Sequence, residues 1–590
     1  MDENPIAGQD IPPAESPNPV PLLTVALEDY FQVGAFNQLI QRGQWYRFEA
    51  RLEQSTLRTL DLLEAHGLHA TFFVLGWVAE QVPELIRRVA DRGHEIASKG
   101  YYHRSIQQMT PSEFREDLTR AREALERASG QRVMGYRVAD NWFRPADLWA
   151  LDVLAEEGYE YDSSIAPLFR RFAAEPWRRF AHPHLYADRV LWEFPISTVQ
   201  PWGIGLPIAG GNYFRQFPHF LMRRAVDHCI RNYSAPFVMY FHVWELDPDQ
   251  PKIQAASWLT RIRQYRGLAK MPRVLDDYFS RYRFTSMANY LGFSTAPTLA
   301  HPVPEVVERD RGSAEVTIAT DRRSATIVVP CYNEELILPY LSNTLKGVEK
   351  NLAGEFALQF IFVDDGSSDG TWVTLRHLFD DWPNARLIRH EGNRGVAEGI
   401  LSGIRACDTE VVCSIDCDCT YDPHELGPMI HLLSDDVDMV TASPYHEDGE
   451  VRNVPRWRLV LSRCLSLLYR LVLRNKLATY TSCFRVYRRE AVVGLQLDRR
   501  GFLGVTEMLG RMDLMGRRIV EYPTTLEVRI LGRSKMKILG TIVGHLGLLT
   551  ALTRRRLGPA ASRAGTRTPP PDQSSRQGRS SRSASDRASV

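Results

Sequence analysis

Residues 358–367 read Leu-Gln-Phe-Ile-Phe-Val-Asp-Asp-Gly-Ser, an apolar run of the β type that ends in two carboxylates. A second such run, residues 411–415, is followed by Asp416 and Asp418. Carboxylates at strand ends converge at the carboxyl edge of a parallel sheet, where open α/β folds bind their ligands. Such a cluster repels itself unless a cation neutralises it, and its oxygen ligands suit Mg²⁺ or Mn²⁺ shared with substrate phosphates. The sequence therefore predicts an α/β domain with a metal and phosphate site.

The composition is that of an ordinary globular protein of more than one domain. The chain has 590 residues, of which 44% are hydrophobic and 24% charged, a length that favours two to four domains. A net charge of +1 gives no overall field for binding nucleic acid. Eight cysteines are too few for a disulfide scaffold of this size, so we expect reduced thiols in a cytosolic compartment.

Composition shifts divide the chain into five parts. The predicted parts are a disordered leader (1–20), an α/β domain (21–295), a linker (296–324), a second α/β domain (325–552) and a basic disordered tail (553–590). The leader lacks the basic and apolar regions of a secretory signal, and no run reaches the roughly 18 apolar residues of a spanning helix. One boundary is marked clearly, because Thr110, Pro111 and Glu113 form a capping box that predicts a helix ending before Gly130.

Several motifs follow one another in the second domain in a telling order. They occupy residues 329–335, 364–367, 416–418, 481–489 and 529–537. Together they resemble glycosyltransferase family 2, in its polyprenyl-phosphate (dolichyl-phosphate) mannosyltransferase-like branch. The resemblance covers nearly all of 325–550 and implies a Rossmann-like nucleotide-diphospho-sugar transferase (GT-A) fold.

The resemblance also implies roles for individual residues. The residues expected to hold the nucleotide are Pro330, Tyr332, Glu334, Asp364 and Asp365. Asp416 and Asp418 would place Mg²⁺ or Mn²⁺ on the diphosphate, where a cation stabilises the leaving group. The side chains expected to receive the diphosphate or an anionic acceptor are Arg485, Arg529, Ser534 and Lys535. The implied reaction is a single displacement with inversion, onto a polyprenyl phosphate or a growing surface glycan.

Two Leu-rich segments suggest contact with a membrane surface. Residues 459–473 are bordered or interrupted by arginines, and residues 538–552 precede Arg554, Arg555 and Arg556. Both are too short to span a bilayer but suit helices that lie in its interface, anchored by cations at anionic headgroups. The alternative is a pair of ordinary core or dimer helices. We expect a peripheral protein at the inner face of the cytoplasmic membrane.

The first domain carries a second set of motifs. They lie at residues 23–32, 69–76, 94–103, 135–137, 192–195 and 240–248. They resemble polysaccharide deacetylases of carbohydrate esterase family 4, in the variant that accompanies exopolysaccharide gene clusters. The implied fold is an irregular (β/α) barrel, and the implied chemistry uses one Asp and two His as metal ligands, with a carboxylate base.

The deacetylase-like site is incomplete. Relatives have Asp where this chain has Ala26, His where it has Lys99, and Pro where it has Ala139. The residues that remain as a degenerate site are Glu28, Asp29, Lys99, His103, Arg137 and His242. An ammonium group donates hydrogen bonds but cannot ligate a metal. Lys99 is therefore expected to pair with Asp29 and Glu28 in the cation's place, leaving a barrel without Zn²⁺ and without activity.

The sequence thus predicts a metal-dependent, inverting glycosyltransferase with an inactive deacetylase-like module. Its expected partners are a nucleotide-sugar, an acceptor lipid or glycan, and a membrane surface, but no nucleic acid. Two alternatives remain: a bifunctional deacetylase and glycosyltransferase of exopolysaccharide biosynthesis, and a glycan-binding scaffold without activity. For glycan binding, the candidate stacking faces are Trp142, Trp192, Trp202 and Trp244, and the alternative for each is core packing.

Overall fold

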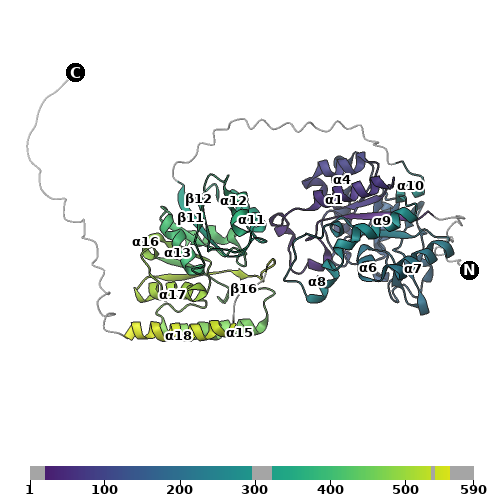
Figure 1. Cartoon of the computed structure of the whole chain (residues 1–590). Coiled ribbons are helices and arrows are strands. Elements are labelled where there is room, and N and C mark those ends of the chain that lie inside the picture. Colours follow the sequence, from purple (N-terminus) through teal and green to yellow (C-terminus); the bar gives the residue numbers. More distant parts are fainter. Residues whose placement is uncertain (1–19, 295–321, 533–537, 558–590) are drawn as a thin grey trace, which may run out of the picture.

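The chain folds into two α/β units that lie beside each other (Figure 1). The computed structural model describes residues 20–294, 322–532 and 538–557. Most of the predicted leader, linker and tail lies outside these ranges. In the second unit the described elements run from a strand that begins at Arg323 to a helix that ends at Leu557, whereas the predicted bounds are 325–552.

The first unit is built on an eight-stranded sheet. In spatial order its strands are β10 (Val238–His242), β1 (Leu22–Leu27), β2 (Thr71–Val74), β3 (Glu95–Ser98), β4 (Gly135–Tyr136), β5 (Tyr161–Asp162), β7 (Arg189–Glu193) and β6 (His182–Tyr186). All neighbours pair in parallel except β6, which runs antiparallel to β7. Every residue of β1, β2 and β3 is buried, as expected for a parallel sheet covered on both faces. The predicted irregular (β/α) barrel is confirmed in this incompletely closed form.

Helices cover this barrel. They are α1 (Leu52–Ala65), α2 (Gly76–Gln81), α3 (Pro83–Asp91), α4 (Pro111–Ser129), α5 (Trp149–Glu156), α6 (Gly211–Gln216), α7 (His219–Asn232), α8 (Trp258–Tyr265), α9 (Met271–Arg281) and α10 (Met287–Leu291). The predicted capping box is present in α4, where Thr110 and Glu113 each accept from the other's backbone N–H. Gly130 ends this helix in the left-handed conformation, at φ 72°.

The second unit has a seven-stranded sheet. Its order is β13 (Ala385–Arg389), β12 (Phe356–Asp364), β11 (Arg323–Cys331), β14 (Val411–Ser414), β17 (Arg485–Arg488), β15 (Met439–Ser443) and β18 (Ile519–Pro523). Only β17 runs against its neighbours. Because β11, β12 and β14 are parallel, their carboxyl ends reach the same edge. The strand-end carboxylates therefore converge as predicted.

The helices of the second unit are α11 (Leu338–Leu352), α12 (Thr371–Phe379), α13 (Val396–Ala406), α14 (Leu426–His431), α15 (Arg456–Val472), α16 (Arg489–Val492), α17 (Gly501–Leu514) and α18 (Ile538–Leu557). Helices α15 and α18 lie side by side along the lower edge of Figure 1. A buried contact of 2.9 Å between the Tyr469 hydroxyl and His545 Nδ1 joins them. No helix in the described ranges is both long enough and apolar enough to cross a bilayer.

The two units share a polar and apolar interface. Arg47, at the end of the 3₁₀ helix η2 (Arg42–Arg47), donates to Asp422 at 2.8 Å. Phe48 packs edge-on against Tyr340 of α11, with ring centroids 5.1 Å apart. These contacts join residues several hundred positions apart in the chain, so sequence patterns gave no sign of them.

Candidate active site

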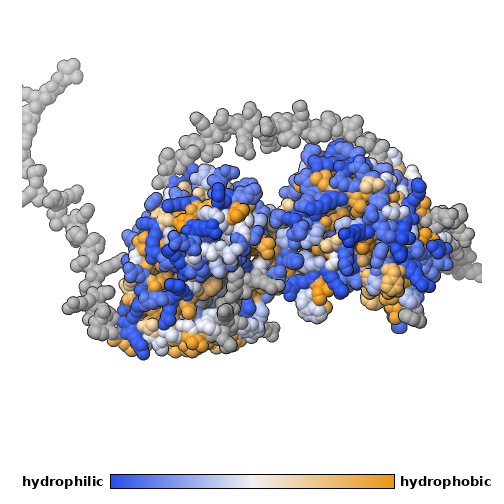
Figure 2. Space-filling model, in the orientation of Figure 1, coloured by the Kyte–Doolittle hydropathy of each residue, from blue (hydrophilic) through white to orange (hydrophobic). Residues whose placement is uncertain are grey.

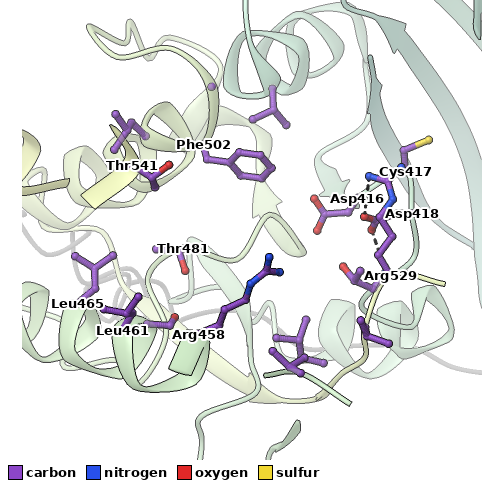
Figure 3. Close-up of a pocket in the computed structure, with 18 of the residues that line it drawn as sticks. Asp416, Cys417, Asp418, Arg458, Leu461, Leu465, Thr481, Phe502, Arg529 and Thr541 are labelled. Atoms are coloured by element: carbon purple, nitrogen blue, oxygen red, sulfur yellow. Dashed lines mark hydrogen bonds and ion pairs between the residues drawn. The ribbon is translucent and has the colours of Figure 1, made fainter. Parts of the chain in front are cut away.

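A cavity of about 1340 Å³ opens at the carboxyl edge of the second sheet. Most of the predicted nucleotide and metal residues line it: Pro330, Tyr332, Glu334, Asp365, Asp416, Asp418 and Arg529. Figure 3 shows the acidic pair and Arg529 on one side of this space. The structure thus brings together predicted residues from four separate sequence motifs.

Asp416 and Asp418 form the acidic centre of the cavity. They follow β14, in a loop where Thr420 donates its N–H to Asp418 Oδ1 at 3.2 Å. Burial and the neighbouring Asp418 carboxylate raise the pKa of Asp416 to about 7. A carboxyl group with such a raised pKa stands where its negative charge lacks compensation. The oxygen donors therefore fit a divalent cation, which would remove this repulsion.

Arg529 faces the acidic pair. Its Nη1 lies 3.5 Å from Asp418 Oδ2, and its other terminal nitrogen pairs with Glu334. Although burial opposes it, the charges of Asp418 and Glu334 raise the pKa of Arg529. A Cβ on Gly532 would come within 2.8 Å of Arg529 Nη2, so this glycine makes room for the guanidinium. The predicted Ser534 and Lys535 lie outside the described residues.

Asp364 and Asp365 organise the neighbouring loops. Asp365 accepts the backbone N–H groups of Arg394 and Gly395 at 2.8 and 2.7 Å, and its Oδ1 lies 2.8 Å from His390 Nδ1. Asp364 is fully buried and accepts the Ser367 N–H at 3.1 Å. Of the two, Asp365 is the one that lines the cavity.

Arg485 does not take the predicted position. It projects from β17 into the protein interior, where it is fully buried. Its terminal nitrogens donate to the carbonyl oxygens of Val505 and Tyr480 at 2.8 and 2.9 Å. Arg485 therefore links β17 to the backbone at Tyr480 and at Val505. Its charge still helps to lower the pKa of Asp416, but it is not among the residues that line the cavity.

Sequence reasoning missed the residues that form the far side of the cavity. Figure 3 shows Arg458 of α15 extending toward the centre, with Phe502 of α17 and Thr541 of α18 around the same space. Beyond them the wall becomes apolar between α15 and α18, through Leu461, Leu465, Leu468, Ile542 and Leu546. The sequence does carry a signal, since Arg458 borders the Leu-rich run 459–473, but the pattern alone favours a role for the bordering arginines at membrane headgroups.

The site of the first unit centres on Glu28. This buried carboxylate pairs with the Lys99 ammonium, and its oxygens lie 2.7 Å from His242 Nδ1 and 3.5 Å from His103 Nε2. Burial opposes the charged form, yet Lys99 and His242 hold the pKa of Glu28 well below its ordinary value. The predicted pairing of Lys99 is thus confirmed for Glu28.

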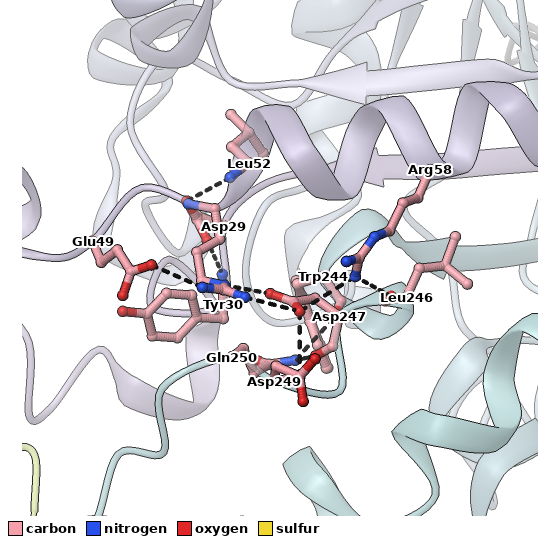
Figure 4. A network of polar contacts seen from close by, with 11 residues as sticks. Asp29, Tyr30, Glu49, Leu52, Arg58, Trp244, Leu246, Asp247, Asp249 and Gln250 are labelled. Atoms are coloured by element: carbon pink, nitrogen blue, oxygen red, sulfur yellow. Dashed lines mark hydrogen bonds and ion pairs between the residues drawn. The ribbon is translucent and has the colours of Figure 1, made fainter. Parts of the chain in front are cut away.

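The prediction that Lys99 also pairs with Asp29 is wrong. Asp29 turns toward the start of α1, where it accepts the N–H groups of Arg51 and Leu52 at 2.8 and 3.0 Å (Figure 4). A carboxylate placed there satisfies backbone donors that a helix cannot pair itself. Burial raises the pKa of Asp29 to about 7. Asp29 therefore serves the helix start in this structure.

Arg137 and the predicted stacking tryptophans occupy packed positions. Arg137 is buried and donates to the Ser163 carbonyl at 3.1 Å and to Thr24 Oγ1 at 2.8 Å. Trp244 is also buried, and Trp142 and Trp192 pack against the core. Core packing accounts for these three; the Trp202 side chain lies outside the described part. Within the described ranges, three ligand atoms close enough to share one metal ion occur at His446, Glu447 and Asp448, on an exposed loop.

Comparison with known proteins agrees with this division. Residues 326–494 match the family model "Glycosyl transferase family 2", residues 43–144 match "Polysaccharide deacetylase", and residues 163–292 match a domain of unknown function (DUF3473). The chain therefore joins a polysaccharide deacetylase domain to a glycosyltransferase family 2 domain. This confirms both predicted resemblances.

Two relatives match the second unit. The chain is 26% identical over 218 residues to a dolichol-phosphate mannosyltransferase of Pyrococcus furiosus, covering 36% of this chain and 59% of that protein. It is 29% identical over 238 residues to a polyprenol monophosphomannose synthase of Mycolicibacterium smegmatis, covering 39% of this chain and 87% of that protein. The chain thus spans about three fifths of the first relative and most of the second.

Two solved structures resemble the two units in turn. A polysaccharide deacetylase-type crystal structure from Mycobacterium smegmatis is 21% identical, covers 50% of this chain and 99% of its own, and has a TM-score of 0.34. Glucosyl-3-phosphoglycerate synthase from Mycobacterium tuberculosis, in complex with Mn²⁺, UDP and phosphoglyceric acid, is 18% identical. That match covers 41% of this chain and 81% of the other, with a TM-score of 0.31.

Proposed function

We propose that the second unit transfers a sugar from a nucleotide-sugar to the phosphate of a polyprenyl lipid or to a growing glycan, with inversion. The carrying observation is the cavity itself, which has the Asp416–Asp418 pair and Arg529 at one end and an apolar wall between α15 and α18 at the other. The charged end of the cavity suits a diphosphate, and the apolar end suits an isoprenoid chain. The names of the two relatives, both polyprenyl- or dolichyl-phosphate mannosyltransferases, support this choice of acceptor.

The nucleotide end is assigned to the loops after β11 and β12. Pro330, Tyr332, Glu334 and Asp365 line the cavity there, and Asp364 supports them from behind. Asp365 fixes the 393–395 loop through two backbone hydrogen bonds. Such fixed polar groups hold a ligand without reorganising during the reaction. We assign them to the base and ribose of the donor.

Asp416 and Asp418 would hold Mg²⁺ or Mn²⁺ on the donor diphosphate. Bound there, the cation supplies charge that stabilises the departing nucleoside diphosphate. Arg529, 3.5 Å from Asp418, would add its own charge to the same phosphates. A phosphate acceptor is already an anion, so positioning rather than a strong general base would set the rate.

The lower face of the second unit suits a membrane surface. Leu471 of α15 and Val543 of α18 are 71% and 70% exposed, and other apolar side chains around them are exposed too. Figure 2 shows hydrophobic surface along this edge, where the two helices lie. Large exposed apolar patches mark interaction sites, and helices of this kind lie in lipid interfaces. We place the protein peripherally at the inner face of the cytoplasmic membrane, where it would meet a lipid acceptor.

For the first unit, the proposal is a domain without metal and without deacetylase activity. The Lys99 ammonium already neutralises Glu28, and Asp29 is committed to the start of α1. A divalent ion at this site would have to displace the Lys99 ammonium from Glu28. It would also have to compete for Asp29 with the N–H groups at the start of α1. A bifunctional enzyme is the second candidate, because His103 and His242 still lie near Glu28. Release of acetate from an acetylated glycan would favour that second candidate.

Product formation tests the transferase proposal. Purified protein is incubated with Mn²⁺, a prenyl phosphate and a panel of nucleotide-sugars, and the lipid fraction is analysed for a glycosylated product. We expect one donor to give product that disappears when EDTA removes the metal. Absence of product with every donor, or undiminished product in EDTA, would contradict the proposal.

A further inference from the structure

A segment of the first unit joins the Arg529 segment of the second. Ile253 and Leu531 form an antiparallel β-bridge, and the Gln254 N–H donates to the Ile530 carbonyl at 2.8 Å. Ile253 is completely buried, and Ile530 and Leu531 are nearly so. This is a backbone pairing sealed by apolar side chains, the kind of contact that fixes the path of both segments.

The pairing lies next to the guanidinium of Arg529. The Arg529 Nε donates to the Leu531 carbonyl at 2.8 Å, so the side chain is braced by the residue that pairs with Ile253. Gly532 follows in the left-handed conformation, at φ 73°, which glycine adopts without steric strain. The first unit thus holds the segment from which Arg529 reaches Asp418.

The same segment also forms part of the cavity wall. Gln254, Ala255 and Arg261 of the first unit line the cavity of the second. Arg261 donates one N–H to Gln254 Oε1 at 2.8 Å, which links its side chain to the segment that pairs with Ile530. Its buried Nε has no hydrogen-bond partner among the residues that the structure describes. A guanidinium has five N–H donors, and the hydrogen bond to Gln254 uses one of them.

We propose that the acceptor site is shared by the two units, with Arg261 of the first unit and Arg458 of α15 binding the phosphate monoester of the acceptor. Arg261 and Arg458 line the one cavity from different units, while Arg529 pairs with Asp418 and Glu334. Guanidinium forks match phosphate oxygens in pairs, which gives orientation as well as affinity. This inference rests on the proposed transferase function and gives the deacetylase-like unit a part in it.

Acceptor kinetics of the full chain test the role of Arg261. Initial rates are measured against a short-chain prenyl phosphate and, in parallel, a sugar phosphate; the acceptor that the wild type uses identifies the source of the phosphate. Arg261→Ala should raise KM for that acceptor at least tenfold and leave KM for the donor within twofold. Arg261→Lys should recover part of the loss, because it restores charge without the fork. The control is Arg263→Ala, an exposed neighbour outside the cavity lining, which should match the wild type.

A second pair of variants tests the backbone hydrogen bond between Gln254 of the first unit and Ile530 of the second. Gln254→Pro removes the N–H that binds the Ile530 carbonyl, whereas Gln254→Ala keeps it. We expect the proline variant to have at least tenfold lower kcat than the alanine variant, with the donor still raising Tm in both.

The inference is overturned if Arg261→Ala leaves the acceptor KM unchanged or raises donor and acceptor KM equally. Equal kcat for the two Gln254 variants would contradict a role for the hydrogen bond to Ile530 in holding the Arg529 segment. If the proline variant does not fold, the Arg261 variants still decide whether the two units share the acceptor site. A wild-type protein that glycosylates neither phosphate contradicts the proposed function itself, before any variant is compared.

Discussion

Arg529 Nη1 lies 3.5 Å from Asp418 Oδ2, yet Asp416, two residues earlier, has a pKa raised to about 7. The Arg529 charge therefore does not offset the effects of burial and of the Asp418 carboxylate on the pKa of Asp416. In the first unit the shift has the opposite sign, because Lys99 pairs with Glu28 and helps to hold the pKa of Glu28 below its ordinary value. The two sites thus differ in charge: in the second unit the acidic pair leaves a carboxyl group with a raised pKa, whereas in the first unit the buried Glu28 already has a cationic partner.

This difference predicts a pH-dependent response to metal. Because the pKa of Asp416 is raised above its ordinary value, the metal-free protein gains stability from it at low pH and loses that gain as pH rises toward 7. A divalent cation must displace this proton. Mn²⁺ should therefore raise Tm more at pH 8 than at pH 6, because a ligand stabilises the state that it binds.

The comparison needs two controls. Asp416→Asn should abolish the Mn²⁺ response at both pH values, whereas Asp435→Asn, at a fully exposed carboxylate, should keep it. Asp29 also titrates near pH 7, but its contribution is the same with and without Mn²⁺ and cancels in the difference. A Mn²⁺ shift that is independent of pH would contradict the assignment of Asp416 as a ligand.

Lys99 should matter for stability. Lys99→Met leaves Glu28 buried without its ammonium partner, and loss of one partner from a buried ion pair costs about 3–5 kcal/mol. The double variant Glu28→Gln, Lys99→Met removes both charges and should recover much of the loss. Chemical denaturation measures both. Elemental analysis of the wild type should find no stoichiometric zinc; stoichiometric zinc, with acetate release that depends on His103, would refute the metal-free assignment.

Helices α15 and α18 should carry the membrane contact. Leu471→Glu and Val543→Glu each place a charge on the exposed apolar face, and each should weaken binding to anionic phospholipid vesicles about tenfold in a flotation assay. Val373→Glu is the matched control, because Val373 is 70% exposed on α12, which lies at the opposite edge of the unit in Figure 1. Equal loss in the control, or none in either helix variant, would argue against docking through this face.

Local patterns carried much of the fold and of the transferase site. The runs before Asp364 and Asp416 are strands that end at one sheet edge, because apolar β-type runs with helical connections pair in parallel. Arg485 shows where such reasoning stops. Its motif identifies the segment, but only the strand's final orientation decides whether the side chain enters the cavity or the interior.

Local sequence patterns could not predict the contact between the two units. The bridge between Ile253 and Leu531 joins two short apolar segments that resemble many others in the chain. Asp29 was misplaced for a related reason, because its partner is the start of α1, fixed by backbone geometry rather than by any charge pattern. Long-range geometry of this kind comes from packing as a whole.

The central claim is that Asp416 and Asp418 hold the cation for sugar transfer. The most direct test is the rate of sugar transfer from the nucleotide-sugar to prenyl phosphate by Asp418→Ala, with Asp435→Ala as the control and circular dichroism to establish that both fold. We predict loss of at least 99% of the rate in Asp418→Ala and an unchanged rate in Asp435→Ala. Undiminished turnover by a folded Asp418→Ala protein would contradict the account.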